Sequence, residues 1–323
     1  MRTSRSAVIL VAAAIALAGC ASNGAPQATP AATPTAATSP TPTPTPTLDP
    51  AGPTRAFDGD CAGVFTDPSA VLGFDAVLRT LETPTGIGTL GGLRCSWTDV
   101  DDLWEGLSLA ALPVQQVPDE LRSRFEATAC DWSYDTLYCH LAATVGGTWV
   151  MVSKASLDES GTVPDLAPVL AAALETAAAA PEPVAATPTA DWWEPVDCAA
   201  LEVTAAIAEV FAPATFEPGY PSAFGAWPTD ELLAPTDQWC PWYSYDINEA
   251  IWMNLLPGAG SQWDDSDFEG ATPVDVVGAQ SAVLVPTADG EVLYATDGAN
   301  VLRIQMSPIP LPDLAARIFA AVS

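Results

Sequence analysis

The sequence predicts an α+β protein of two tandem similar domains, each an antiparallel sheet with helices packed on one face. Three observations lead to this prediction. Short sequence landmarks recur in the same order in two halves of the chain, each half begins and ends with a helical hydrophobic pattern, and alternating apolar runs lie between them. At 323 residues, the chain is also longer than one domain usually is.

Composition divides the chain into five segments. We expect a signal peptide over 1–19, a tether over 20–56, a first domain over 57–180, a linker over 181–190 and a second domain over 191–323. The linker is a Pro/Ala/Thr-rich break between two halves of similar length.

The first segment has the layout of an export signal. Arg2 and Arg5 form a basic start, and the apolar run that follows is too short to span a bilayer. The run ends at Leu17-Ala18-Gly19-Cys20, which resembles the cleavage box of bacterial lipoproteins. This resemblance implies that Cys20 begins the mature protein and carries a diacylglycerol, with acyl chains such as palmitate, that holds the protein on the extracytoplasmic face of the cell membrane. An ordinary secretory signal, with Cys20 a spare thiol, is the alternative.

The tether is rich in Ala, Thr, Pro and Ser, and strict Thr/Pro alternation runs from Thr41 to Thr47. Such a composition cannot build a core and predicts an extended, semi-stiff segment. A stalk with O-glycosylated threonines and a plain disordered linker are both compatible with it.

The two halves carry five matching landmarks, which indicate a duplication. The pairs are Asp60-Cys61-Ala62 with Asp197-Cys198-Ala199, Cys95-Ser96-Trp97 with Cys240-Pro241-Trp242, Leu112-Pro113 with Leu256-Pro257, Tyr138 with Tyr294, and Pro164-Asp165-Leu166-Ala167 with Pro312-Asp313-Leu314-Ala315.

Helical patterns open and close each half. In the first half Asp67 is the expected N-cap and Pro68 the first helical residue; in the second Asp197 is the N-cap and Pro213 the stop. The expected apolar stripes are Val71, Phe74, Val77, Leu78 and Leu81 for the first opening helix, Val203, Ile207, Val210 and Phe211 for the second, and Leu166, Leu170, Leu174 and Leu314, Ile318, Val322 for the two closing helices.

Alternating apolar runs fill the space between these helices. Turn signals at Gly146-Gly147, Asp289-Gly290 and Asp297-Gly298 separate the runs. Each half therefore predicts three to five antiparallel strands.

Six cysteines remain when Cys20 is set aside, an even number that predicts a disulfide framework in an exported protein. Because the repeat places them at matching positions, we expect Cys61–Cys95 and Cys198–Cys240 to tie the first helix to the first strand of each half. Cys130 and Cys139 flank a hairpin and should bridge its strands. These roles are structural rather than metal-binding or redox-active.

The halves also resemble actinobacterial lipoprotein domains of unknown function, in which a cysteine opens a helix and a later Cys-x-Trp opens the sheet. The matching residues are Cys61 with Cys95 and Trp97, and Cys198 with Cys240 and Trp242. The resemblance implies a fold and supplies no activity.

Charge limits the partners. The chain has 10 basic and 40 acidic side chains and a formal net charge of −30. Such a field repels nucleic acids and anionic surfaces, so we expect no nucleic-acid partner.

Three motifs suggest ligands only weakly. Residues 86–91 match a dinucleotide fingerprint but lack the strand before and the helix after it, so we expect a flexible loop. Residues 265–270 resemble the start of a calcium loop, yet Val276 stands where a glutamate is required. Asp99, Asp101 and Asp102 form a second acidic cluster. We interpret both clusters as solvated loops and expect no metal and no cofactor.

Catalytic constellations are not evident. The single histidine, His140, follows a disulfide cysteine and predicts a structural role, and there is no Ser-His-Asp relay. The separation between two catalytic carboxylates cannot be recognised in a sequence with so many acidic residues, so an extracellular hydrolase stays as an alternative.

Tryptophans in loops are the remaining candidates for a ligand surface. They are Trp192, Trp193, Trp227 and Trp263. The competing interpretation is that they cover the edge of the core or the contact between the repeats.

We therefore expect a non-enzymatic, membrane-anchored surface lipoprotein that binds an unknown envelope protein or small ligand. A hydrolase using acidic side chains and a structural envelope protein are the alternatives. A deep cleft with two carboxylates roughly 5–10 Å apart would indicate the hydrolase. Exposed tryptophans around a groove would indicate binding, and neither feature would indicate the structural role.

Overall fold

A computed structural model describes most of the chain beyond the tether. The described residues are 53–79, 84–100, 106–133, 136–156, 162–210, 217–218, 228–233, 235–244, 246–247, 249–268, 270–287, 290–306 and 310–322. They belong to one compact unit. The signal segment, Cys20 and nearly all of the tether lie outside them.

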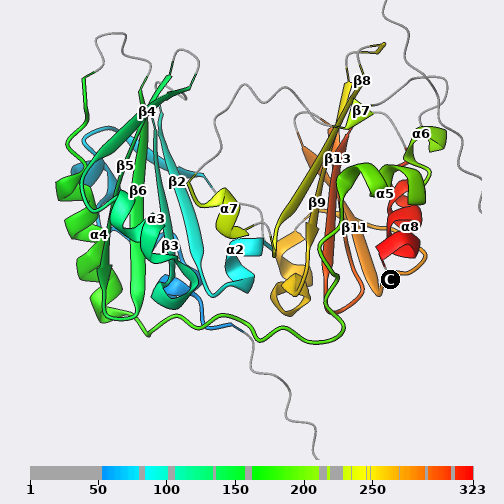
Figure 1. Ribbon diagram of the computed structural model, residues 1–323, viewed down its shortest axis with the longest axis horizontal. Coiled ribbons are helices and arrows are strands. Elements are labelled where there is room, and N and C mark those ends of the chain that lie inside the picture. Colours follow the sequence, from blue (N-terminus) through cyan, green and yellow to red (C-terminus); the bar gives the residue numbers. More distant parts are fainter. Residues whose placement is uncertain are drawn as a thin grey trace, which may run out of the picture. The chain divides into compact units, whose positions relative to one another are not determined.

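The first repeat contains a six-stranded antiparallel sheet of order β1-β2-β3-β6-β5-β4 (Figure 1). Its strands are β1 (Ala76–Arg79), β2 (Leu93–Asp99), β3 (Gly106–Pro113), β4 (Ala129–Ser133), β5 (Thr136–Val145) and β6 (Thr148–Ser156).

The second repeat contains a seven-stranded antiparallel sheet of order β10-β11-β12-β13-β9-β8-β7. Its strands are β7 (Glu217–Pro218), β8 (Gln238–Ser244), β9 (Glu249–Leu256), β10 (Thr272–Pro273), β11 (Ser281–Thr287), β12 (Gly290–Thr296) and β13 (Val301–Met306). Both sheets exceed the predicted three to five strands. In the second sheet, the two-residue edge strands β7 and β10 carry no alternation that a sequence could reveal. In the first sheet, the edge strand β1 holds residues that the sequence predicted to be helical.

The two sheets have the same topology. Read from β7, the second sheet repeats the strand order of the first and adds β10 at the far edge. Equivalent buried rows cross both sheets, one residue per strand. They are Cys95, Leu109, Val152 and Leu141 in the first sheet, and Cys240, Met253, Ile304 and Leu293 in the second. The α+β fold with two tandem similar domains is thereby confirmed.

The register of the two sheets shows that one of the five landmark pairs, Tyr138 with Tyr294, is wrong. Because Leu141 corresponds to Leu293, Tyr294 corresponds to Ala142, the next residue, and not to Tyr138. Each tyrosine does precede a strand, β6 or β13, but it stands at a different register position in its own sheet.

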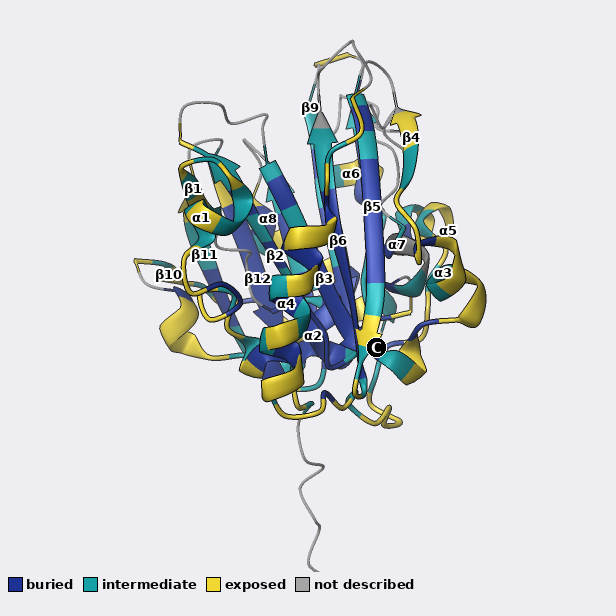
Figure 2. Cartoon of the chain, turned by 90° about the vertical axis from the view of Figure 1, so that its left-hand side faces the viewer, coloured by how far each residue is buried: buried dark blue, intermediate teal, exposed yellow. Residues whose placement is uncertain are grey.

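The closing helices cover one face of each sheet, as predicted. α4 (Ala167–Ala179) lies on the first sheet and α8 (Leu311–Val322) on the second (Figure 1). Leu166, at the N-cap of α4, is buried together with Leu170, and so are Leu314 and Ile318 of α8. The opposite side of α4 is exposed, as Figure 2 shows.

The first opening helix is shorter than predicted. Asp67 does cap it, accepting a hydrogen bond from the amide of Ala70 (3.1 Å), but α1 spans only Pro68–Leu72. Gly73 ends the helix in the left-handed conformation with φ of 79°. Val77 and Leu78 therefore lie on β1, and Leu81 lies outside the described residues.

The second opening helix is interrupted. Asp197 caps α5 (Cys198–Thr204) as predicted, and a break at Ala206, with φ of 48°, separates it from α6 (Ile207–Val210). The break rotates the stripe, so Ile207 is fully buried whereas Val203 is 79% exposed. Phe211 and Pro213 lie outside the described residues.

Short helices and smaller apolar clusters cover parts of the opposite sheet faces. The helices are α2 (Gly86–Thr89), α3 (Asp119–Arg124), α7 (Asp230–Leu233), η2 (Val114–Gln116), η3 (Ala259–Gln262) and η4 (Asp265–Phe268). The short helix η1 (Ala56–Gly59) instead lies on the α4 side of the first sheet, where Ala56 and Phe57 pack in the same cluster as Leu170. One cluster joins Phe125, Trp149 and Met151 to Leu233 of the second repeat, and another gathers around Phe268 and Tyr294.

The three predicted disulfides are present. Cys61–Cys95 and Cys198–Cys240 have Cα–Cα distances of 5.5 and 5.4 Å, and Cys130–Cys139 joins directly opposed residues of β4 and β5. The third bridge has no counterpart in the second repeat, where Pro286 and Glu291 occupy the equivalent pair.

The elements that the two larger bridges join differ from the prediction. Cys95 and Cys240 lie on the second strand of each sheet, because β1 and β7 precede β2 and β8. Cys61 lies in a bend before α1, whereas Cys198 is the first residue of α5. The prediction missed the short edge strands, and it assumed that both cysteines open helices.

Candidate functional site

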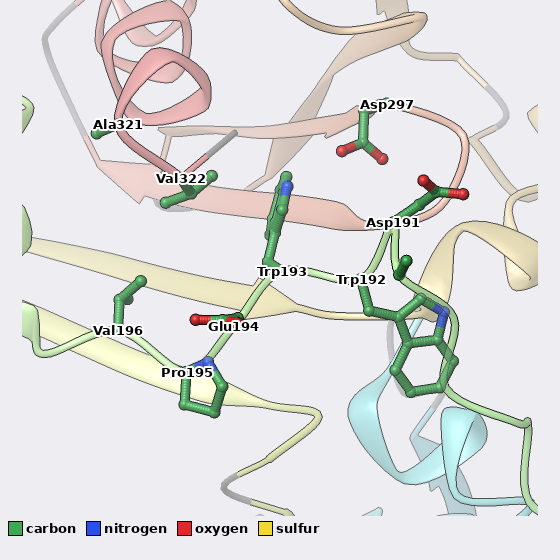
Figure 3. A pocket seen from close by; sticks show the side chains of 10 residues that line it. Asp191, Trp192, Trp193, Glu194, Pro195, Val196, Asp297, Ala321 and Val322 are labelled. Atoms are coloured by element: carbon green, nitrogen blue, oxygen red, sulfur yellow. The ribbon is translucent and has the colours of Figure 1, made fainter.

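A pocket of about 610 Å³ lies in the second repeat (Figure 3). It is lined by residues 190–196, by Asp297 from the turn between β12 and β13, and by Ala321 and Val322 from α8. Two of the four tryptophans selected from the sequence, Trp192 and Trp193, belong to this lining.

A buried asparagine positions the segment that forms the pocket. The side-chain oxygen of Asn300 accepts hydrogen bonds from the amides of Trp193 (3.0 Å) and Gly258 (3.2 Å), and its side-chain nitrogen donates to the carbonyl of Asp191 (2.8 Å). Asn300 is fully buried. Asp297 shapes the turn between β12 and β13 that carries Asn300, because it accepts hydrogen bonds from the backbone amides of Ala299 and Asn300.

The two tryptophans of the pocket have different environments. Trp193 is 7% exposed and packs edge-to-face on Phe319 of α8 with 5.4 Å between ring centroids, so much of it belongs to the core. Trp192 is half-buried. Its indole lies over Gly258, where an added Cβ would come within 2.2 Å of the ring, so this position accepts only glycine.

All charged side chains that line the pocket are acidic. Asp191, Glu194 and Asp297 are its carboxylates, and none of its lining residues is basic. Both oxygens of Asp297 are occupied by hydrogen bonds from Asn300. The exposed carboxylates of Asp191 and Glu194 have no hydrogen-bond or ion-pair partner within the described chain. Two carboxylates are therefore available to a ligand.

The other two selected tryptophans do not join this pocket. Trp263 packs on Phe268 with 4.8 Å between ring centroids, and its indole nitrogen donates to Asp265 (2.8 Å). It thus covers the edge of a small cluster, in agreement with the competing interpretation for this residue. Trp227 lies outside the described residues.

Sequence reasoning did not select Trp239, which is 46% exposed and stacks on Trp252 at an interplanar angle of 6°. Its position could have been inferred, because Trp239 alternates along β8 with the buried Cys240 and so points to the opposite face.

The calcium-like segment is organised by its own side chains. Asp264 accepts hydrogen bonds from the amide (2.9 Å) and hydroxyl (2.7 Å) of Ser266, and these bonds hold the pKa of Asp264 below its usual value. Among the residues that the structure describes, no three His, Cys, Asp or Glu side chains gather as a metal site. Asp101 and Asp102 of the second acidic cluster lie outside these residues, and Asp99 is on β2.

The glycine-rich segment 86–91 is not a flexible loop, contrary to the prediction. Its first four residues form the buried helix α2. Thr236 donates from its hydroxyl to the carbonyl of Gly86 (3.0 Å), and the side-chain nitrogen of Gln262 donates to Thr85 O (3.0 Å) and Thr89 Oγ1 (2.9 Å). The glycines permit this close contact between the repeats, because a Cβ on Gly86 would come within 2.5 Å of the Thr236 carbonyl oxygen.

His140 pairs with a serine that the sequence did not suggest. Its Nδ1 lies 2.7 Å from Ser153 Oγ, and burial lowers its pKa to about 4. A neutral imidazole beside a hydroxyl can act as a base toward a nucleophile. Here, however, His140 and Ser153 are directly opposed on β5 and β6 and only 5% and 2% exposed. A substrate has no access to the hydroxyl, so the pair is structural.

No described helix combines the length and apolarity needed to cross a membrane. No protein family model, curated protein or solved structure matches this chain.

Proposed function

We propose that the protein is a lipoprotein, anchored through Cys20 to the extracytoplasmic face of the cell membrane, and that it binds a ligand in the pocket at Trp192 and Trp193 without catalysing a reaction. The tether would carry the folded part away from the membrane surface.

The observation that carries this proposal is the composition of the pocket. Half-buried Trp192, buried Trp193 and two carboxylates without partners line a space of about 610 Å³. Sites for small ligands commonly measure about 300–1,000 Å³ and combine apolar walls with a few polar groups. This lining therefore supports a binding role over a purely structural one.

Two observations, the pattern of the first twenty residues and the three disulfides, support export, and the first of them also supports anchoring. The first twenty residues have a basic start, a short apolar run and a lipobox-like ending. The three disulfides fit a protein that matures in an oxidising compartment.

The pocket favours binding over hydrolysis. A hydrolase acting through carboxylates needs a proton donor held in an enclosed site beside a second carboxylate. Asp191 and Glu194 are exposed, and the oxygens of Asp297 are occupied by the neighbouring turn.

The anchor is tested by substituting Cys20→Ser. Cells grown with labelled palmitate should incorporate label into the wild-type protein, which should partition into detergent. The variant should incorporate none and should partition into water. Labelled variant, or unlabelled wild type, would contradict the anchor.

The binding role is tested by photo-crosslinking on intact cells. A benzophenone amino acid replaces Glu194 at the pocket or, as a matched control, Glu175, an exposed glutamate on α4. A discrete adduct from position 194 and none from position 175 is the expected result. The same adducts from both positions, or none from either, would contradict a binding role for the pocket.

A further inference from the structure

We propose that the pocket at Trp192 and Trp193 takes a small organic cation, an amine with a methylene body and ammonium groups at its ends. The inference rests on the proposed binding function and adds the chemical class of the ligand.

The charges of the pocket select for a cation. Every ionisable side chain in the lining is a carboxylate, and those of Asp191 and Glu194 have no partner within the described chain. An anionic ligand would be repelled, and a neutral one would gain no charge attraction from the two carboxylates. The net charge of −30 adds a field that concentrates cations near the protein.

The carboxylates are divided between two sides of the pocket. In Figure 3, Asp191 and Asp297 lie on one side of Trp193 and Glu194 lies on the other. A ligand with two separated ammonium groups can therefore meet a carboxylate at each end.

The rest of the lining suits a methylene chain. Pro195, Val196, Ala321 and Val322 supply apolar surface, and Figure 3 places them on the same side of Trp193 as Glu194. Half-buried Trp192 adds an indole, the aromatic ring that attracts cations most strongly. An exposed contact of this kind is worth roughly two- to fivefold in affinity.

The test compares 1,5-diaminopentane with 1,5-pentanediol, which matches it in length and shape but is uncharged. Isothermal titration calorimetry of the full chain should detect binding of the diamine and none of the diol. Asp191→Asn and Glu194→Gln should each weaken diamine binding about two- to fivefold. Glu175→Gln removes the same charge from an exposed position in the first repeat and should leave the affinity unchanged. Circular dichroism melting confirms that each variant folds.

Three results would overturn the inference. The first is no diamine binding at millimolar concentration, and the second is equal binding of the diamine and the diol. The third is equal weakening of diamine binding by Glu194→Gln and Glu175→Gln, because that result would indicate diffuse attraction to an acidic surface. Failure of the inference is distinguishable from failure of the proposed function. A specific photo-adduct at position 194 would preserve the binding role with a different ligand class, whereas its absence would remove both.

Discussion

Asn300 illustrates how much a single buried side chain can organise. Its amide bonds to three backbone groups from two segments, Asp191, Trp193 and Gly258. An unpaired buried polar group costs about 1–3 kcal/mol, so these bonds hold the pocket-forming segment in one conformation. The pocket therefore depends on a residue that does not line it.

His140 makes stability depend on pH. Desolvation by burial lowers its pKa to about 4, with a smaller lowering by Arg124 and an opposing effect of Asp131. Between about pH 6.5 and 4 the unfolded chain therefore binds a proton that the folded protein excludes. Its contribution to stability is complete above pH 6.5 and is lost as pH falls toward 4, a loss of about 3 kcal/mol.

Urea unfolding of the wild type and of His140→Gln between pH 7.5 and 4.5 checks this expectation. The free energy of unfolding of the wild type should fall more steeply with acidification than that of the variant, which lacks the titrating group. Parallel curves would contradict it. The comparison cancels the pH dependence of the many carboxylates, which both proteins share.

At the scale of elements, helix α2 joins the two repeats because its glycines allow close approach. A methyl group on Gly86 would lie 2.4 Å from Asp237 Cβ and 2.5 Å from the Thr236 carbonyl oxygen. Backbone atoms cannot move aside as a flexible side-chain end can.

Gly86→Ala should therefore destabilise the protein by about 1–3 kcal/mol. Gly63→Ala is the matched control, because the nearest atom to its added methyl is a carboxylate oxygen of Asp60 at 3.2 Å. Thermal and urea denaturation measure both variants. Equal stability of the two would show that α2 does not hold the repeats in contact.

At the scale of the whole molecule, each of the two repeats contains an equivalent large-loop disulfide. The bridges Cys61–Cys95 and Cys198–Cys240 close loops with sequence separations of 34 and 42 residues, against 9 for Cys130–Cys139. Loop-closure entropy grows with loop length, so the two larger bridges restrict the unfolded chain more.

Replacing each pair by alanine should lower the free energy of unfolding by about 4 kcal/mol for either large bridge and about 3 kcal/mol for the small one. Urea titration of the three double variants provides the measurement, and each variant serves as a control for the others. A larger decrease in the free energy of unfolding for the small bridge than for the large ones would contradict stabilisation through loop closure.

Local patterns in the sequence determined several features without the tertiary structure. Asp67 and Asp197 cap helices, each closing helix buries two of the three residues of its predicted stripe, and all three disulfides form as predicted. Caps and helix periodicity act over a few residues. The matching order of the landmarks indicated the pairing of the two larger bridges, and a short hairpin indicated that of Cys130 with Cys139. The α+β class and the tandem repeat follow from the same signals.

Contacts between distant residues decided the rest. The helix after Asp67 stops at Gly73, and residues 86–89 form a helix whose Gly86 contacts Thr236, 150 residues later. Trp193 is placed by Asn300, 107 residues away, and Trp192 by the missing side chain of Gly258. A sequence shows that a tryptophan lies in a loop. Whether it borders a pocket or covers a core depends on which distant backbone packs against it, and only the folded chain determines that.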